Sequence, residues 1–535
     1  MSLIPFVPQV HLESEIVLIG LLPPLLYATA IKTSVIDFRS QLPAIGYLSI
    51  GLVIVTALLV GLLAWALLPI GFAAAFALGA VVSPPDAVAA TAVGRRIGLP
   101  RRLVSLLEGE SLVNDATAIT CLRMGIIAMG TSVTVVQVAQ MFALALVGGV
   151  AIGVVAAFVI ARVRRHLTDP ITDTALSFAA PFVAYLPAEA IHSSGVIAVV
   201  TTGLILGHRA PIIQTAQSRL SERNNWSTIQ YLLENAVFLL IGLQFHWIIT
   251  DVAGRGVAPA RVAAFCLAVL VGVIVIRMVW TVLGMTLLLY RGRAGRAKLK
   301  VSIIGGWAGM RGVVTLAAAL LLPESTPYRE LLLLAAMVVT AGTLLLQGLT
   351  LGPLARRLGI GGPDAREDAL AMAAVMERVG SQALTRLEAD RPVEDHSSAM
   401  QMVRDRAATR TNAIWERLGR ADDTLAPSEE YRALRLTSLQ YEREAVLRIR
   451  SAGEADQEIV TRVLSILDVE ESMLAGIESG LEPIEGDPLT ARRPTCARTS
   501  SGPRATPARA PSDRTVTSAR TACARAPPPC ICGCA

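Results

Sequence analysis

The chain has 535 residues, of which 53% are hydrophobic and 17% are charged, and its mean hydropathy is +0.56. So apolar a chain of this length is not a soluble globular protein, and the composition predicts a polytopic protein of the lipid bilayer. The formal net charge is +6, but Ala491–Ala535 alone hold eight Arg and one Asp. Without that tail the chain is close to neutral, so nucleic acid is not expected as a partner.

Apolar runs separated by polar or basic residues predict about eleven membrane spans. Pro181, Pro187 and a very short connection predict that two of them, 172–190 and 193–208, are short or broken helices. The predicted spans are 15–35, 43–68, 71–94, 103–130, 134–162, 172–190, 193–208, 229–250, 259–290, 301–323 and 329–352.

Basic residues are distributed unevenly between the connections. Alternate connections, with the span ends beside them, hold seventeen Lys and Arg, and the intervening connections hold three. Because basic connections remain in the cytoplasm, this asymmetry predicts a multi-pass protein of the cell membrane with its N-terminus outside and its C-terminus cytoplasmic. The sequence contains no Gly-rich phosphate-binding loop followed by Lys and Ser or Thr, which disfavours an ATP-driven pump.

The chain is predicted to contain three regions. Residues 1–360 form a transmembrane domain, and 361–480 form a cytoplasmic helical domain with amphipathic helices over 365–418 and 429–474. The segment 481–535, rich in Arg, Pro, Ala and Cys, cannot bury a core and is predicted to be disordered.

The segment Glu108-Gly-Glu-Ser-Leu-Val-Asn-Asp115 places three carboxylates and an amide directly before an apolar run. Ionisable groups at membrane depth are costly and indicate a functional site. On a helix Glu110 and Asn114 are four residues apart, and Ser111 is three and four residues from Asn114 and Asp115. One helix face therefore offers the hard oxygen ligands that a small alkali cation needs when it loses water.

Two predicted spans contain residues that interrupt a helix. Val82-Ser-Pro-Pro-Asp86 lacks two backbone donors beside an acid, and Gly305-Gly-Trp-Ala-Gly-Met-Arg311-Gly312 places four glycines around an Arg. A matched pair of broken helices is typical of inverted-repeat transporters, because carbonyls and helix ends exposed at the midplane can coordinate ions. We expect Asp86 and Arg311 to compensate the partial charges at the ends of the half-helices.

Five motifs in order resemble the sodium/proton exchanger branch of the monovalent cation/proton antiporter superfamily, in its bacterial type with a cytoplasmic C-terminal extension. The resemblance runs from about residue 13 to 354, and less sharply to about 474. The motifs are Leu22-Pro-Pro-Leu-Leu-Tyr-Ala28, Ser83-Pro-Pro-Asp-Ala-Val88, Glu108-Gly-Glu-Ser-Leu-Val-Asn-Asp115, Leu233-Glu-Asn-Ala-Val-Phe-Leu-Leu-Ile-Gly242 and Gly309-Met-Arg-Gly312.

The resemblance implies an all-α polytopic membrane protein with the inverted-repeat antiporter fold, two broken crossing helices and a cytoplasmic helical C-terminal domain. It also implies a homodimer that exchanges Na⁺, or K⁺ or Li⁺, for H⁺ without a cofactor and serves pH and sodium homeostasis. Asp115 would carry either a proton or the cation. Asn at position 114, where other relatives have a second Asp, implies electroneutral exchange.

Further roles follow from the same resemblance. Sodium would be coordinated by Asp115, Asp86 and Ser111, with Asn114 beside them. Glu110 would pair with Arg311, and Arg277 would face the crossing of the broken helices. Ser83, Pro84 and Pro85 would form the non-helical backbone of the first break, and Gly309 and Gly312 that of the second.

The sequence departs from the family pattern at two places. Relatives commonly have Thr where Pro85 stands, and about two further helices before the Leu22-Pro-Pro span. The alternative is therefore a non-transporting truncated remnant or a regulatory membrane protein of the same fold. A membrane-embedded aspartyl protease would need a Gly-x-Gly-Asp motif, which the sequence lacks.

Other polar residues within the spans are expected to be structural. Glu189 and Glu234 would brace neighbouring helices. Thr120 and Thr315 would bond to the backbone of their own helices.

Overall fold

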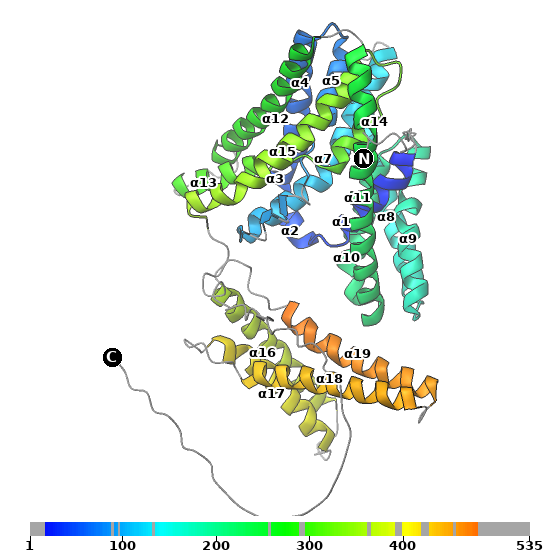
Figure 1. Ribbon diagram of the computed structural model, residues 1–535, viewed down its shortest axis with the longest axis vertical. Helices are drawn as coiled ribbons and strands as arrows, with labels where there is room; N and C mark the ends of the chain where they lie inside the picture. The colour runs from blue at the N-terminus through cyan, green and yellow to red at the C-terminus, as the bar shows by residue number, and fades with distance from the viewer. Residues whose placement is uncertain are drawn as a thin grey trace, which may run out of the picture. The chain divides into compact units, whose positions relative to one another are not determined.

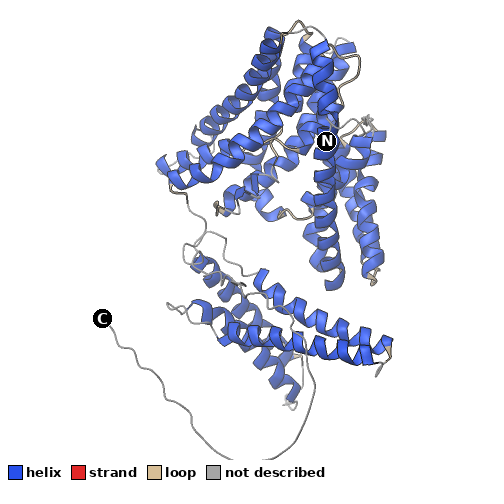
Figure 2. Ribbon diagram, in the orientation of Figure 1, coloured by secondary structure: helices blue, strands red, loops and turns tan. Residues whose placement is uncertain are grey.

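The computed structural model describes residues 16–86, 90–91, 93–94, 97–130, 134–254, 258–287, 295–360, 365–390, 398–418, 427–452 and 456–479. Within these residues the regular elements are helices and no strand occurs (Figure 2). This confirms the all-α prediction. The predicted tail, 481–535, lies outside the described residues.

The apolar part of the chain is a bundle of helices (Figure 1). Two π-helical turns, Ile16–Leu21 and Tyr47–Gly51, lead into α1 and α4. The helices are α1 (Leu22–Ala30), α2 (Val35–Ser40), α3 (Leu42–Gly46), α4 (Leu52–Leu67), α5 (Phe72–Val82), α7 (Arg101–Gly130), α8 (Val135–Arg164), α9 (Pro170–Ala190), α10 (Gly195–Ile213), α11 (Ala216–Gly254), α12 (Pro259–Leu287), α13 (Gly295–Trp307), α14 (Val313–Leu320) and α15 (Arg329–Leu358).

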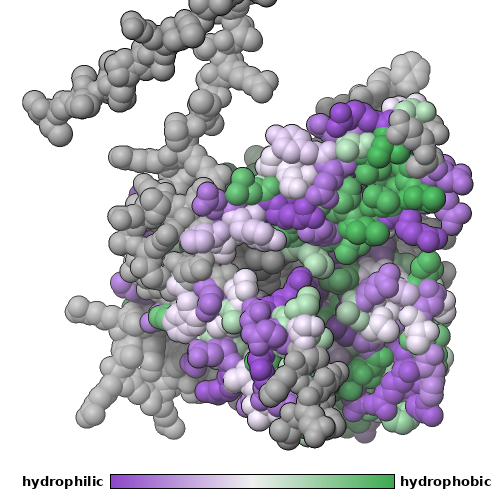
Figure 3. All heavy atoms as spheres, turned by 90° about the horizontal axis from the view of Figure 1, so that it is seen from below, coloured by the Kyte–Doolittle hydropathy of each residue, from purple (hydrophilic) through white to green (hydrophobic). Residues whose placement is uncertain are grey.

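Among the described residues, six helical segments are long and apolar enough to cross a membrane. Many of their large apolar side chains are exposed, for example Phe158 on α8 and Leu349 on α15, as expected for surfaces in contact with lipid. The face shown in Figure 3 mixes hydrophilic with hydrophobic residues. The six segments are Leu42–Leu67, Arg101–Gly130, Ala139–Arg164, Gly195–Ile213, Pro259–Gly284 and Arg329–Leu358.

Two helices differ from their predicted spans. α9 runs without a break through Pro181 and Pro187, so the prediction of a short or broken helix there is wrong. Each proline removes one backbone hydrogen bond, which a helix packed among other helices in a membrane tolerates. α11 has 39 residues and begins at Ala216, well before the predicted start at 229, because its first turns are polar and carry no hydropathy signal.

The two predicted helix breaks are present and meet. α5 ends at Val82 and α13 ends at Trp307, each followed by non-helical backbone. The backbone N–H of Asp86 donates to the carbonyl of Met310 at 2.7 Å. Thr315, on the half-helix α14 after the second break, donates through its hydroxyl to the carbonyl of Pro84 at 3.4 Å. The breaks are therefore joined by hydrogen bonds between their backbones and side chains.

Four amphipathic helices follow the apolar part: α16 (Ala365–Ala389), α17 (Ser398–Leu418), α18 (Pro427–Ala452) and α19 (Gln457–Ser479). An ion pair joins α18 to α19: Nε of Arg435 lies 2.8 Å from Oε1 of Glu470. Division of the chain at residues 360 and 480 stays a prediction.

Candidate functional site

The acidic motif lies within the 30-residue helix α7, which packs against α3, α4, α5, α8, α10, α13 and α14. Glu110 is 1% exposed, Asn114 is fully buried and Asp115 is 4% exposed. A helix surrounded on so many sides carries these groups into the interior, where no bulk water offsets the cost of an unpaired charge. Their partners therefore decide what the site can do.

Asn114 links α7 to the first break. Its amide nitrogen donates to the carbonyl of Pro85 at 3.0 Å, while its amide oxygen has no hydrogen-bond partner among the described residues. The carbonyls of Pro84 and Pro85 thus already accept hydrogen bonds, and the hydroxyl of Ser83 donates to Ala80 in its own helix. Asn114 is not among the residues that line the cavity described next, and its role as a cation ligand stays a prediction.

A cavity of about 310 Å³ lies beside the crossing of the broken helices. Asp86, Ser111 and Asp115, the three predicted sodium ligands, line one cavity together with Glu234 of α11. Thr29 of α1 and apolar side chains of α1, α7, α11, α14 and α15 form the rest of its lining. The cavity brings carboxylate and hydroxyl oxygens from α7 and the first break into one apolar chamber.

Two glycines of the second break allow the side chains of Asp86 and Arg277 to lie close to its backbone. A Cβ atom on Gly312 would lie 1.9 Å from Oδ2 of Asp86, and one on Gly309 would lie 2.0 Å from Nε of Arg277. Because Gly312 precedes α14, the carboxylate of Asp86 lies at the positive end of that half-helix, which favours an anion. This placement agrees with the expectation for Asp86.

The predicted pairing of Glu110 with Arg311 is wrong. Glu110 pairs with Arg277 of α12, whose Nη1 and Nη2 donate to its two carboxylate oxygens at 2.5 and 3.0 Å. Arg277 also donates to the carbonyls of Gly305 and Gly306 at the end of α13. Arg277 therefore compensates the negative end of the half-helix, the role predicted for Arg311, and it faces the second break as expected.

Arg311 lies in the second break and is fully buried. None of its three guanidinium nitrogens has a hydrogen-bond partner among the described residues. Its backbone N–H donates to the hydroxyl of Thr343 on α15 at 2.9 Å, and its charge interacts with those of Asp115, Glu110 and Arg277. The guanidinium thus contributes positive charge to the site without forming a fixed ion pair.

The formal charges near the crossing sum to minus one. Asp86, Glu110 and Asp115 contribute three negative charges when ionised, and Arg277 and Arg311 contribute two positive charges. Glu234 is linked separately: Gln230 donates to it at 2.9 Å and accepts from Lys32 at 2.9 Å. One proton or one monovalent cation would therefore neutralise the crossing.

Of the residues expected to be structural, Glu189 braces α7 and α10. It accepts from Arg123 at 2.8 Å and from the backbone N–H of Gly195 at 3.0 Å. Thr120 bonds to its own helix through the carbonyl of Ala116, as predicted. The same prediction for Thr315 is wrong, because Thr315 lies in the first turn of the half-helix α14 and its hydroxyl reaches the other break instead.

Sequence reasoning did not identify Thr343, which holds the backbone of the second break. Its hydroxyl accepts from Arg311 and donates to the carbonyl of Thr340 in its own helix. A lone threonine in an apolar span carries no sequence signal that separates this role from bonding within its own helix. The only indication would have been its position in a span next to the second break.

Comparisons with known proteins point to one family. Residues 3–357 match the family model described as sodium/hydrogen exchanger, transmembrane. An uncharacterized Na⁺/H⁺ exchanger of Mycobacterium tuberculosis is 32% identical over 89% of this chain and 90% of its own length. The Na⁺/H⁺ antiporter NhaP of Pseudomonas aeruginosa is 32% identical over 65% of this chain and 82% of its own length.

The same fold occurs among solved structures. A sodium proton antiporter of Methanocaldococcus jannaschii, solved at pH 8, superposes with a TM-score of 0.52 at 17% identity. The match covers 65% of this chain and 88% of that one. This likeness confirms the predicted fold class.

Proposed function

Because the chain belongs to the sodium/hydrogen exchanger family, we propose that it is a secondary active transporter that exchanges Na⁺ for H⁺ across the plasma membrane. The observation that carries this proposal is the cavity in which Asp115, Asp86 and Ser111 meet beside the two helix breaks. Oxygen ligands suit an alkali cation, and Asp115 can hold either a proton or that cation. Sodium and protons then compete for one carboxylate.

The charge sum at the crossing supports electroneutral exchange. With Asp86, Glu110 and Asp115 ionised, two guanidinium groups leave one negative charge. The empty site would be charged in a low-dielectric interior, whereas the site holding H⁺ or Na⁺ would be neutral. Only the two loaded forms of the site can then switch between the two sides of the membrane at low energetic cost. Each cycle therefore moves one positive charge in each direction.

Arg311 and Arg277 divide the supporting roles. Arg277 fixes Glu110 and the end of α13, so it holds the two broken regions in register. Arg311, whose guanidinium has no hydrogen-bond partner among the residues described, lowers the energy of the ionised Asp115 without occupying its oxygens. The carboxylate is thereby left free for the transported ion.

The predicted orientation of the chain in the membrane rests on its charge distribution. The uneven distribution of basic residues supports an N-terminus outside and a C-terminus in the cytoplasm. An exchanger in this orientation would serve pH and sodium homeostasis. The homodimer, and transport of K⁺ or Li⁺ beside Na⁺, stay predictions. Convergence of the two broken regions on one cavity that contains carboxylate oxygens disfavours the alternative of a non-transporting remnant.

The test is exchange in proteoliposomes that contain the purified full chain and an internal pH dye. A sodium gradient is expected to drive proton movement at the same rate whether or not an ionophore clamps the membrane potential to zero. Ser111→Ala should weaken the apparent sodium affinity, while Thr120→Val, which loses only a bond within its own helix, should leave it unchanged. A rate that depends on the membrane potential would contradict electroneutrality.

A further inference from the structure

A second cavity, of about 290 Å³, lies on the face of α7 opposite to Ser111 and Asp115. Val113 and Ala116 line it, whereas Ser111 and Asp115 line the first cavity, and Leu112 lines both. We call the first the transport cavity and the second the apolar cavity. The turn of α7 that carries the predicted ion ligands therefore separates the two cavities.

The apolar cavity lies within the membrane-crossing part of the bundle. Phe38 of α2 lines it, and every other lining residue belongs to one of four of the segments that are long and apolar enough to cross a membrane. Three lining residues, Leu42 of α3 and Leu146 and Val150 of α8, are 48%, 37% and 41% exposed. The cavity therefore opens on the side of the bundle, where the surface of a membrane protein meets lipid.

The lining offers little to water. Its polar side chains are three threonines, and the hydroxyls of Thr117 and Thr120 donate to the carbonyls of Val113 and Ala116 in their own helix, at 3.0 and 2.8 Å. An ordered water inside a protein needs about two to four polar partners. The third threonine, Thr201 of α10, does not supply them alone, so the cavity is expected to exclude water and to accept an apolar occupant.

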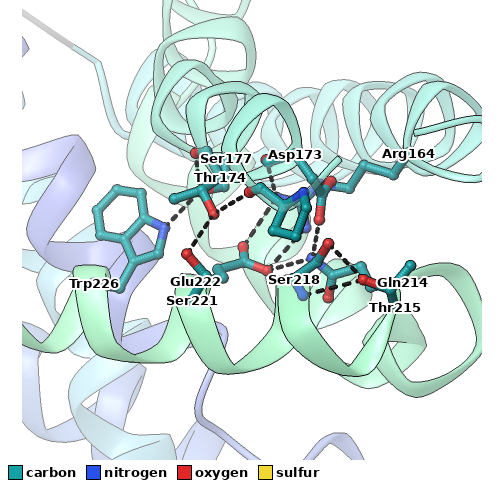
Figure 4. Close-up of polar contacts among 11 residues, drawn as sticks. Arg164, Asp173, Thr174, Ser177, Gln214, Thr215, Ser218, Ser221, Glu222 and Trp226 are labelled. Carbon is teal, nitrogen blue, oxygen red and sulfur yellow. Dashed lines mark hydrogen bonds and ion pairs between the residues drawn. The ribbon is translucent and has the colours of Figure 1, made fainter. Parts of the chain in front are cut away.

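One wall of the apolar cavity, formed by α8 and α10, is held by polar contacts outside the cavity. Arg164 at the end of α8 lies between Asp173 of α9 and Glu222 of α11, at 3.2 and 3.0 Å (Figure 4). Gln214, which follows α10, donates to both carboxylates at 2.8 and 2.5 Å. This buried cluster connects α8, α9, α10 and α11, so it fixes α8 and α10 relative to each other.

Close packing completes this wall. A Cβ atom on Gly153 of α8 would lie 2.6 Å from the carbonyl oxygen of Ala198 on α10, so the two backbones are in contact. The hydroxyl of Thr202 donates to the carbonyl of Gly153 at 3.0 Å. Small residues permit this approach, as in other pairs of membrane helices. The open space therefore lies between this wall and α7 rather than within the wall.

The opposite wall is fixed to α7. Ser49, in the π-helical turn before α4, donates through its hydroxyl to the carbonyl of Glu110 at 2.9 Å, and the amide of Gln41 donates to the hydroxyl of Ser105 at 3.3 Å. Glu110 is itself held by Arg277. Because each wall is braced within itself, the apolar cavity does not close by a small shift of one helix. It is a preformed site.

We propose that the apolar cavity binds one acyl chain of a bilayer phospholipid. An unbranched, flexible chain enters an enclosed cavity of this kind more readily than a helix of a second copy, which is about 10 Å across. Lipid chains are as apolar as the lining, so the gain comes from packing contacts that an empty cavity would forfeit.

The opening also suits the head group of the lipid. Phe38 lines the cavity from α2, a helix that packs against both α7 and α10. Arg39, the next residue, is exposed and carries a positive charge, which favours the lipid phosphate. The acyl chain packs on Val113 and Ala116, behind the predicted ion ligands, so it holds α7 in position beside the transport cavity.

The site is tested by photolabelling, which does not depend on transport. The full chain is placed in phosphatidylglycerol vesicles that contain a little of the same lipid with a diazirine in the middle of one acyl chain, and labelled residues are identified by mass spectrometry. We expect label on Ala116, which is 1% exposed and out of reach of lipid at the surface, as well as on Phe158, which is 64% exposed. Label on Phe158 without label on residues 112–120 would overturn the proposal, whether the cavity is empty or covered by a second copy.

A matched pair of glycine variants makes the assignment specific. Gly46 lines the apolar cavity and Gly242 lies outside it on α11, and a Cβ atom on either meets nothing within 4 Å. Gly46→Leu should fill the cavity and abolish the label on Ala116 while keeping that on Phe158, and Gly242→Leu should change neither. Thr117→Val, which makes the lining more apolar, should keep the label on Ala116. Label that persists in Gly46→Leu, or that is lost in Thr117→Val, would overturn the proposal.

The effect on exchange rests on the proposed function and is measured separately. Branched acyl chains enter a narrow cavity poorly, so wild-type exchange should be severalfold slower in diphytanoyl phosphatidylglycerol than in the straight-chain lipid. Gly46→Leu, whose own side chain occupies the cavity, should exchange at the same rate in both lipids. Equal wild-type rates would refute the role of the acyl chain in exchange, while photolabelling still decides the site if the protein does not exchange ions.

Discussion

The buried ion pair between Glu110 and Arg277 is expected to be a main contributor to stability of the crossing. Each side chain is 1% exposed and the two contacts measure 2.5 and 3.0 Å. Glu110→Gln leaves the Arg277 charge without its carboxylate, and removing one partner of a buried pair costs about 3–5 kcal/mol. At about 1.4 kcal/mol for each factor of ten, the ratio of folded to unfolded protein should fall by roughly two to three and a half orders of magnitude.

A double-mutant cycle measures this coupling. Glu110→Gln, Arg277→Met and the double variant are unfolded by denaturant in one detergent, and the free energies of unfolding are compared. Because the double variant buries no unpaired charge, its loss should be smaller than the sum of the single losses by at least about 2 kcal/mol. Losses that add within about 0.5 kcal/mol would show that the pair contributes no specific coupling, and the reasoning would be refuted.

Two further predictions concern a glycine and the helices after the membrane spans. Gly312→Ala places a Cβ 1.9 Å from the Asp86 carboxylate and should reduce exchange at least tenfold in folded protein, whereas Gly242→Ala, with open space around it, should leave the rate unchanged. The hydrogen bond from Arg435 holds the pKa of Glu470 below its usual range. The pair therefore stabilises the packing of α18 on α19 at pH values above the unfolded-state pKa of Glu, about 4.3. This stabilisation is lost as the pH falls through the lower pKa of Glu470 in the folded protein. Hydrogen exchange in α19 should accelerate with acid, and less so in Arg435→Met.

The sequence predicted the features that arise from local chemistry. Hydropathy located the apolar helices, and Pro84, Pro85 and the glycines around Arg311 located both breaks, because each of these residues acts on its own backbone. The spacing predicted that Glu110, Ser111, Asn114 and Asp115 share one helix face, but of these four only Ser111 and Asp115 line the cavity. The assignment of these residues as ion ligands stays a prediction.

Sequence reasoning failed where a side chain could choose among distant partners. Glu110 is 167 residues from Arg277 and farther still from Arg311, and spacing cannot decide which guanidinium reaches it. Arg164 lies at the end of an apolar run, and nothing in the neighbouring sequence shows that its partners are Asp173 and Glu222. Packing of the helices decided both cases.

Competition between sodium and a proton for Asp115 is the central claim. The most direct measurement is the number of protons released when sodium binds to the purified full chain in weakly buffered detergent solution, followed with a pH dye and compared with Asp115→Asn. We expect one proton released for each sodium bound to the wild type and none from the variant. Sodium binding without proton release, or release that persists in Asp115→Asn, would contradict the claim.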